Sequence, residues 1–298
     1  MTVCVAAIFN NSTILGACDR MLGVANIQFQ PAQAKIWQLT SSIVAMPASN
    51  NVNLQYEIHQ EVVRVVNDRI ASNPKEWWQV KEVANLYRQF YQEARIKRIE
   101  EAILFPRILD RNTYIQRQKE LSDEFMREIS SDLVQFELPR TSILLAGNDG
   151  QLSNTVPHLY VIEDGEVSCH DVIGFAAIGS GRLHAGSQFM FDGYTRFKEA
   201  PTALFNVLWA KKRSEVAQGV GPKTDMFTIG PFLGSYFQLP EEFVQKVERL
   251  YEQRQKRFLE FNERSRIRVK TFLDSLQPPP PASQPPPVPP PPSPEKNT

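Results

Sequence analysis

Before Asn50, the apolar residues fall into short runs that polar turn formers separate. Runs of this kind, rich in β-branched side chains, are typical of buried strands. They predict strands at residues 2–9, 12–18, 20–29, 35–39 and 42–47. The interruption at Asn10-Asn11-Ser12 predicts a turn between the first two strands, so that a hairpin opens the chain.

Beyond Asn50, the apolar residues recur at the spacing of one helix face, as Leu54, Ile58 and Val62 illustrate. This spacing predicts helices at residues 50–73, 76–104, 108–134, 181–193 and 201–217. Further strands are predicted at residues 141–147, 156–162, 166–178, 224–229 and 232–238.

The order of these elements indicates the fold class. Strands, helices, strands, helices and strands follow one another, as in an α+β fold with two antiparallel sheets sandwiched between helical layers. Residues 2–239 would form this domain. Residues 97–135 are longer than such an architecture needs, so we expect an inserted helical arm there.

The C-terminal part differs in composition. Residues 240–276 are predicted to form one amphipathic helix, with Phe243, Val247 and Phe258 on one side. Such a helix packs on its own domain or on a neighbouring subunit more often than on a membrane. Residues 277–298 are dominated by proline, which lacks a backbone donor and fixes φ, so we expect an extended, disordered tail. Alternatively, the tail docks on a polyproline-binding domain of another protein.

Charge and cysteine content exclude several classes of protein. Lys+Arg and Asp+Glu number 33 each among 298 residues, so no positive excess points to nucleic acid. Cys4, Cys18 and Cys169 have no paired spacing, which favours reduced thiols over a disulfide framework. The sequence shows no apolar stretch of membrane-spanning length, and its apolar start lacks the basic flank of a secretion signal. We therefore expect a soluble, cytoplasmic protein.

The main candidates for catalytic residues are Thr2, Asp19 and Lys35. Because initiator methionine is normally trimmed before a small residue, we expect the mature chain to begin at Thr2. A free N-terminal threonine holds a nucleophilic hydroxyl and, in its own α-amine, a base. A lysine in an apolar strand is costly to bury unless a carboxylate pairs with it, and Asp19 can be that carboxylate. Otherwise, Thr2 is an ordinary strand residue and Lys35 a surface lysine on an edge strand.

The spacing of these three residues resembles the N-terminal third of a proteasome β-subunit and of the bacterial two-component proteasome-like peptidase. Three later segments resemble the same family in the same order: 142–150, 175–181 with its Gly-Ser-Gly, and 224–229. The resemblance implies an N-terminal nucleophile (Ntn) hydrolase, whose fold is a four-layer αββα sandwich. Here the sandwich would carry the helical arm and the C-terminal helix as additions.

The resemblance also implies roles for further residues. Ser49 takes the position whose backbone N–H points at the oxyanion, although it or Asn50 could equally cap the following helix. Ser180 matches a serine that hydrogen-bonds near the N-terminal amine, unless it too is a helix cap. Glu215 and Gln218 replace an aspartate and a serine of the family, which changes the positioning of the α-amine.

We therefore expect a threonine peptidase or amidohydrolase that acts on peptides through Thr2, Asp19, Lys35, Ser49, Ser180 and Glu215. We expect no cofactor, and the four histidines show no spacing typical of a metal site. The resemblance implies a homo-oligomeric ring or spiral. The alternative is a catalytically inactive assembly or scaffold protein that binds partners through its C-terminal helix and proline-rich tail.

Overall fold

The computed structural model of the protein describes residues 2–24, 27–29, 35–49, 51–151 and 154–276. In these residues the strands form two antiparallel five-stranded sheets and a separate two-stranded one. The first sheet contains, in spatial order, β10 (Phe175–Gly179), β1 (Val3–Phe9), β2 (Thr13–Asp19), β11 (Thr224–Ile229) and β12 (Tyr236–Gln238). The second sheet contains β5 (Trp37–Gln38), β6 (Ile43–Ser49), β7 (Thr141–Gln151), β8 (Asn154–Glu163) and β9 (Glu166–Cys169).

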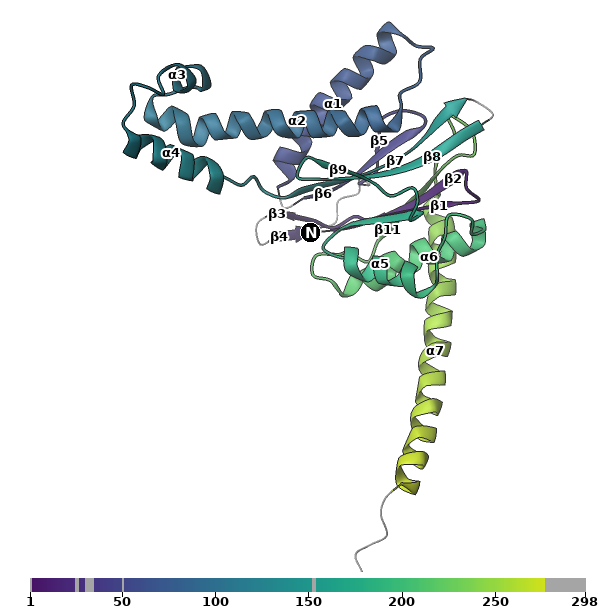
Figure 1. Cartoon of the computed structure of the whole chain (residues 1–298). Helices are drawn as coiled ribbons and strands as arrows, with labels where there is room; N and C mark the ends of the chain where they lie inside the picture. The colour runs from purple at the N-terminus through teal and green to yellow at the C-terminus, as the bar shows by residue number, and fades with distance from the viewer. Residues whose placement is uncertain (1, 25–26, 30–34, 50, 152–153, 277–298) are drawn as a thin grey trace, which may run out of the picture. The chain divides into compact units, whose positions relative to one another are not determined.

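Helices pack on both sheets (Figure 1). The helices α1 (Val52–Ser72) and α2 (Val80–Ile99) lie along the second sheet, and α5 (Arg182–Phe191) and α6 (Ala200–Arg213) lie along the first. The combination of helices with antiparallel sheets agrees with the predicted α+β class. The start of α7 (Glu241–Ser275) joins the first sheet's helical side, where Val244 and Val247 are buried.

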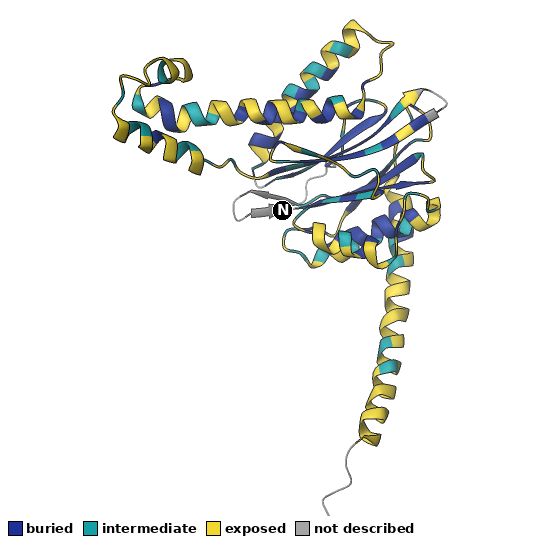
Figure 2. Cartoon of the chain, viewed as in Figure 1, coloured by how far each residue is buried: buried dark blue, intermediate teal, exposed yellow. Residues whose placement is uncertain are grey.

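Strand β1 is buried on both faces (Figure 2). Because successive side chains of a strand point to opposite faces, its residues divide between two cores. Val5 packs in a cluster with Val207 of α6, whereas Ala6 packs with Leu144 of β7 in a cluster formed by both sheets. The predicted first strand is therefore central, with β2 and β10 as its neighbours.

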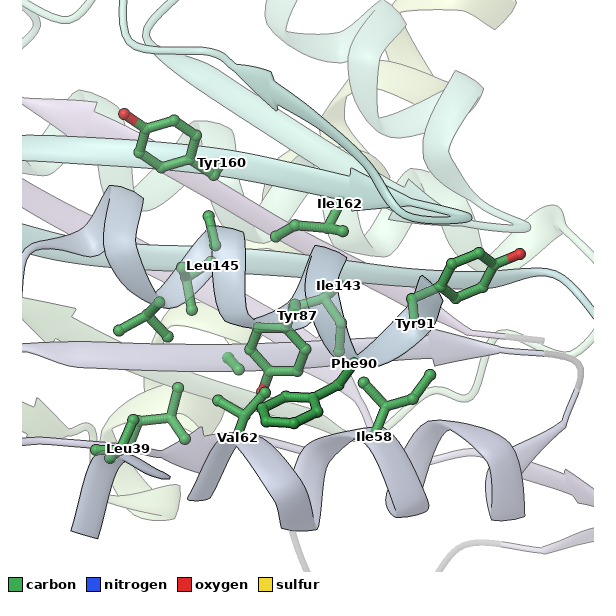
Figure 3. Close-up of a cluster of buried hydrophobic side chains, with 14 of the residues drawn as sticks. Leu39, Ile58, Val62, Tyr87, Phe90, Tyr91, Ile143, Leu145, Tyr160 and Ile162 are labelled. Atoms are coloured by element: carbon green, nitrogen blue, oxygen red, sulfur yellow. The ribbon is translucent and has the colours of Figure 1, made fainter. Parts of the chain in front are cut away.

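The second sheet has a separate core with α1 and α2 (Figure 3). Ile58 of α1, Tyr87 and Phe90 of α2, and Ile143 and Leu145 of β7 belong to this cluster. The helical period predicted from Leu54, Ile58 and Val62 is confirmed, because all three side chains are buried there.

The arm between α2 and β7 forms a small core of its own. After α2 the chain passes through a π-helical turn, η1 (Glu100–Leu104), and a 3₁₀ turn, η2 (Phe105–Arg107). The helices α3 (Arg111–Gln116) and α4 (Asp123–Gln135) replace the one helix predicted over 108–134. Asp110 and Ser122 each cap a helix with their side chains, so the chain begins two helices here.

Two predicted strands are wrong in their extent. Residues 20–29 contain β3 (Leu22–Val24) and β4 (Ile27–Phe29), which pair with each other instead of forming one strand. Residues 166–178 contain β9 and β10, which belong to different sheets. Gly174, whose φ of +81° is unfavourable for other residues, lies just before β10 where the chain changes sheet.

The chain divides into two compact units, Met1–Tyr251 and Glu252–Thr298, and the boundary falls within α7. The second unit contains the remainder of that helix, where Phe258, Phe261 and Phe272 are exposed. The proline-rich tail predicted over 277–298 lies outside the described residues, as does Met1. A search of the helices in the described residues finds none with the length and apolarity needed to cross a membrane.

Candidate active site

Strand pairing brings the first residues of the chain to the end of the second strand. Cys4 pairs with Cys18 across β1 and β2, so Asp19 lies beside the start of β1. The backbone N–H of Val3 donates to Asp19 Oδ1 at 2.9 Å. This contact is independent of the side chain at position 3, and it anchors the carboxylate next to Thr2.

The side chains of Thr2, Asp19 and Lys35 meet at this point, as the sequence predicted. Lys35 Nζ lies 2.5 Å from Thr2 Oγ1 and 3.2 Å from Asp19 Oδ1. Thr2 Oγ1 also makes a close hydrogen bond with Asp19 Oδ1. Exposure is 2% for Thr2, 5% for Lys35 and 0% for Asp19, so the lysine is not a surface residue. Burial of both charges is tolerated because they form an ion pair.

Lys35 does not lie inside a strand, contrary to the prediction. The chain bends at Lys35, and β5 begins only at Trp37. The ammonium also donates to the backbone carbonyl of Met21. The lysine therefore reaches the site from the segment before the strand, where its backbone is free of the sheet pairing.

Both oxygens of Asp19 accept hydrogen bonds. Oδ1 faces Thr2, Val3 and Lys35. Oδ2 accepts from the backbone N–H of Met21 at 2.9 Å and from that of Gly221 at 3.0 Å. A carboxylate held at both oxygens has a fixed orientation, so the acceptor beside the Thr2 hydroxyl is fixed as well.

Ser180 contacts the backbone of Thr2. Its hydroxyl lies 3.3 Å from the carbonyl oxygen of Thr2 and 3.2 Å from that of Gln218, and it can donate to either. The helix-cap alternative is wrong, because the N-cap of α5 is Gly181 and makes no side-chain cap bond. Gln218 therefore reaches the site through its carbonyl group.

Ser49 ends strand β6 and lines the same cavity as Thr2. The Ser49 hydroxyl accepts a hydrogen bond from the Asn51 N–H at 2.9 Å. It lies 3.1 Å from the carbonyl oxygen of Arg140, to which it can donate. The cap of α1 is Asn51, whose Oδ1 accepts from Leu54 N at 3.0 Å, so Ser49 is not the N-cap; Asn50 lies outside the described residues.

The cavity beside Thr2 has a volume of about 420 Å³ and a polar lining. An ion pair between Arg182 and Glu163 forms part of its wall, and Ser142 lies 3.4 Å from the same carboxylate. Arg140 and Leu183 also line the cavity. Thr2 is thus a nearly buried residue that lines a space large enough for several side-chain-sized groups.

Glu215 is not at Thr2. It lies in the 3₁₀ turn η3 (Ser214–Val216), and its carboxylate bonds Lys211 Nζ at 2.6 Å and Lys212 Nζ at 3.2 Å. None of the contacts found in the described residues joins it to Thr2. The two neighbouring lysines hold its carboxylate, so the expected role of Glu215 at Thr2 has no support in these contacts.

Gly221 and Met21 at the site could not be predicted from the sequence. Both act through the backbone, and backbone groups bond in the same way whatever the side chain.

Arg20 has a structural role that the sequence analysis does not predict. It forms two hydrogen bonds with Asp225, at 2.8 and 2.6 Å, and so ties the end of β2 to β11.

The cysteines near the site are not nucleophiles. Cys4 is fully buried, and burial raises the pKa of its thiol to about 12. A thiol must lose its proton to act as a nucleophile, so Cys4 is inert at neutral pH. Among the residues that the structure describes, no group of three or more His, Cys, Asp or Glu side chains is placed to hold a metal ion.

Comparison with known proteins adds no family: the chain matches no protein-family model and no curated protein. The geometry around Thr2 is therefore the main observation that bears on function.

Proposed function

We propose that this protein is a threonine-type Ntn hydrolase of the proteasome type, which cleaves peptide or small amide bonds. The observation that carries the proposal is the position of the Thr2 hydroxyl, 2.5 Å from the Lys35 ammonium, in a residue that lines a cavity. A threonine hydroxyl is a weak nucleophile until a cation and a base activate it. Lys35 supplies the cation, and the α-amine of Thr2 supplies the base when Thr2 is the first residue.

The proposed fold is the four-layer αββα sandwich. Its support is the cluster shared by the two sheets, which includes Ala6 and Leu144, together with the helices packed on the other face of each sheet. In such a fold β1 is central and its first residue stands at one edge of the layers. Thr2 has that position here, directly before β1.

In the proposed reaction, Thr2 Oγ1 attacks the substrate carbonyl carbon and its proton passes to the α-amine through a water molecule. Lys35 stabilises the developing alkoxide, and Asp19 keeps the ammonium in place. The protonated amine then gives its proton to the leaving nitrogen, and an ester with Thr2 remains. Water hydrolyses this ester and restores the hydroxyl.

Two serines have supporting roles in this proposal. The backbone N–H of Ser49 is assigned to the oxyanion, because Ser49 lines the same cavity as Thr2. Ser180 holds the Thr2 carbonyl through its hydroxyl, which limits rotation of the nucleophile's backbone. Glu215 has no role here, because the two lysines occupy its carboxylate.

The test uses the purified full chain and a pool of fluorogenic peptides. Intact-mass measurement and N-terminal sequencing first establish whether the chain begins at Thr2. A peptide β-lactone, which acylates reactive hydroxyls, should then add its full mass at Thr2. Thr2→Val replaces the hydroxyl by a methyl group of similar size and should abolish both turnover and labelling.

Thr13→Val is the matched control, because Thr13 is also buried but lies at the opposite end of the hairpin. It should keep the turnover of the unmodified protein. A chain that begins at Thr2 and still neither cleaves peptides nor takes the label would refute the proposal.

The scaffold function remains a second candidate because of one observation. In the unit that begins at Glu252, α7 exposes Phe258, Phe261 and Phe272, which would suit contact with another protein. The ring or spiral assembly implied by the resemblance belongs to the same question. Sedimentation of the full chain and of a Phe258→Asp/Phe261→Asp variant separates the candidates: a scaffold loses its assembly state, whereas peptide turnover without a change of size favours the enzyme.

A further inference from the structure

A second buried lysine, Lys211, is connected to Asp19 through one loop residue. Lys211 lies in the last turn of α6, and its side chain is completely buried. The loop that follows η3 passes over it on the way to β11 and brings Gly221 between the lysine and Asp19.

Each proton of the Lys211 ammonium has an acceptor. Nζ donates to the carbonyl oxygens of Gly221 at 2.9 Å and Pro222 at 2.8 Å, and to Glu215 Oε1 at 2.6 Å. An ammonium has three protons to donate, so its hydrogen bonding is complete. Two consecutive carbonyl groups of the loop are thereby fixed on one side chain.

The other side of the same loop residue contacts the candidate active site. The N–H of Gly221 donates to Asp19 Oδ2 at 3.0 Å, while Oδ1 of that carboxylate faces Thr2 and Lys35. Movement of Gly221 would remove one of the two donors to Oδ2 and leave only the Met21 N–H there, so the carboxylate would be held less firmly. Greater rotational freedom of the carboxylate would let Oδ1 deviate from its position beside Thr2 and Lys35.

We propose that Lys211 is a positioning residue for the Thr2 site: it holds Gly221 so that the Gly221 N–H fixes Asp19 in the orientation that serves Thr2 and Lys35. The kinetic part of this inference rests on the proposed hydrolase function. Lys211 itself touches neither substrate nor the reacting hydroxyl, and its effect passes through the backbone of Gly221.

The cost of the lysine supports a specific role. Burial lowers the pKa of Lys211, and the neighbouring Glu215 opposes this shift. Burying an ammonium costs more free energy than burying an apolar side chain of the same length. A buried lysine at this position is therefore best explained by a need for its hydrogen bonds. Here those bonds order the loop segment that meets Asp19.

Lys212 provides a matched control. It is the next residue of α6, and its ammonium also bonds Glu215, at 3.2 Å, and the Pro222 carbonyl, at 3.1 Å. Its third partner is Glu248 of α7, at 2.9 Å, where Lys211 has Gly221. The two lysines therefore differ in the one contact that the proposal invokes.

The experiment compares Lys211→Met and Lys212→Met in the full chain. For Lys211→Met we expect kcat for peptide hydrolysis to fall at least tenfold with KM within twofold, and amide exchange of Gly221 to rise at least tenfold. Amide exchange of Val5 and Ala6 in β1 should stay as in the unmodified protein. Lys212→Met should leave kcat and Gly221 exchange within twofold.

If Lys211→Met does not fold, Lys211→Met/Glu215→Leu replaces the ion pair by two apolar side chains, and the same results are expected of it. An unchanged kcat, or unchanged Gly221 exchange, in the variant that folds overturns the proposal. If the unmodified protein cleaves no peptide, the proposed function fails by itself. Gly221 exchange then decides the positioning role alone: a tenfold rise confined to the loop supports it, and no rise overturns it.

Discussion

Gly179 and Thr2 approach each other so closely that a Cβ atom on Gly179 would lie 2.2 Å from the carbonyl oxygen of Thr2. Gly179 pairs with Val3 at the start of β1, and its φ of +89° lies in the region that glycine favours. The same carbonyl oxygen lies within reach of the Ser180 hydroxyl. The backbone of the candidate nucleophile is thus enclosed by the end of β10.

Gly179→Ala should therefore displace Thr2. We expect peptide hydrolysis to fall at least tenfold and the free energy of unfolding to fall by about 1–3 kcal/mol, the usual cost of a non-glycine residue in this backbone region. Gly186→Ala in α5 is the control, because a Cβ there meets no atom within 4 Å. Urea unfolding and steady-state kinetics measure both effects. Equal activity in the two variants would contradict the prediction.

Lys35 gives the most direct test of the chemistry. Lys35→Ala removes the ammonium that lies 2.5 Å from Thr2 Oγ1, and we expect kcat/KM to fall at least a hundredfold, equivalent to about 3 kcal/mol. Lys75→Ala, at an exposed position, should change nothing. Turnover by the Lys35 variant at the rate of the unmodified protein would show that the hydroxyl is not activated by this lysine.

His59 should make the protein less stable in acid. It hydrogen-bonds the Tyr87 hydroxyl at 2.7 Å and stacks on Trp37, and burial lowers its pKa to about 4. Between about pH 6.5 and 4 the unfolded chain binds a proton that the folded one does not, so the free energy of unfolding falls as the pH falls. The full loss is about 3 kcal/mol.

His59→Gln should remove this dependence, whatever it costs at neutral pH. Urea unfolding at pH 7 and pH 4 measures the difference, with His184→Gln at an exposed position as the control. The interpretation fails if the His59 variant loses as much stability between the two pH values as the unmodified protein does.

His158 should have the opposite pH dependence. The Asp171 carboxylate, 2.6 Å from its Nδ1, raises the pKa of His158, and Asp149 at 3.4 Å from Nε2 adds to the shift. A raised folded-state pKa means that the contribution to stability is complete below the unfolded value near 6.5 and is lost as the pH rises through the folded value.

His158→Gln should consequently destabilise the protein more at pH 6 than at pH 9. Chemical unfolding of the variant and the unmodified protein at both pH values gives the comparison. A cost that is equal at the two pH values would mean that His158 acts only through packing or as a neutral hydrogen-bond partner.

How far the sequence predicted this structure depends on the range of each interaction. The predicted strands at 2–9 and 12–18 agree with β1 and β2 to within one residue at each end. Both are mostly apolar, and the polar residues Asn10-Asn11-Ser12 mark the turn between them. The division of 166–178 between two sheets was missed. Nothing local distinguishes Phe175 in β10 from a continuation of β9, because its partner Ala7 is remote in the sequence.

The candidate site shows the same limit. Thr2, Asp19 and Lys35 were grouped correctly because side-chain chemistry and spacing both point to them. Glu215 was assigned by position in a resembled pattern, and its lysine neighbours, one turn earlier in α6, decide where its carboxylate goes. Gly221 could not be found, because its N–H is common to almost every residue and only the fold brings it to Asp19.

The central place of β1 has a consequence for the dynamics of the nucleophile. An end of a chain usually frays, because few contacts oppose its local opening. Thr2 adjoins a strand that is hydrogen-bonded on both sides and buried on both faces, so release of the whole strand would disrupt the sheet and both cores. Local release of this strand should therefore cost nearly as much as global unfolding, and the nucleophile should keep its place for as long as the protein stays folded.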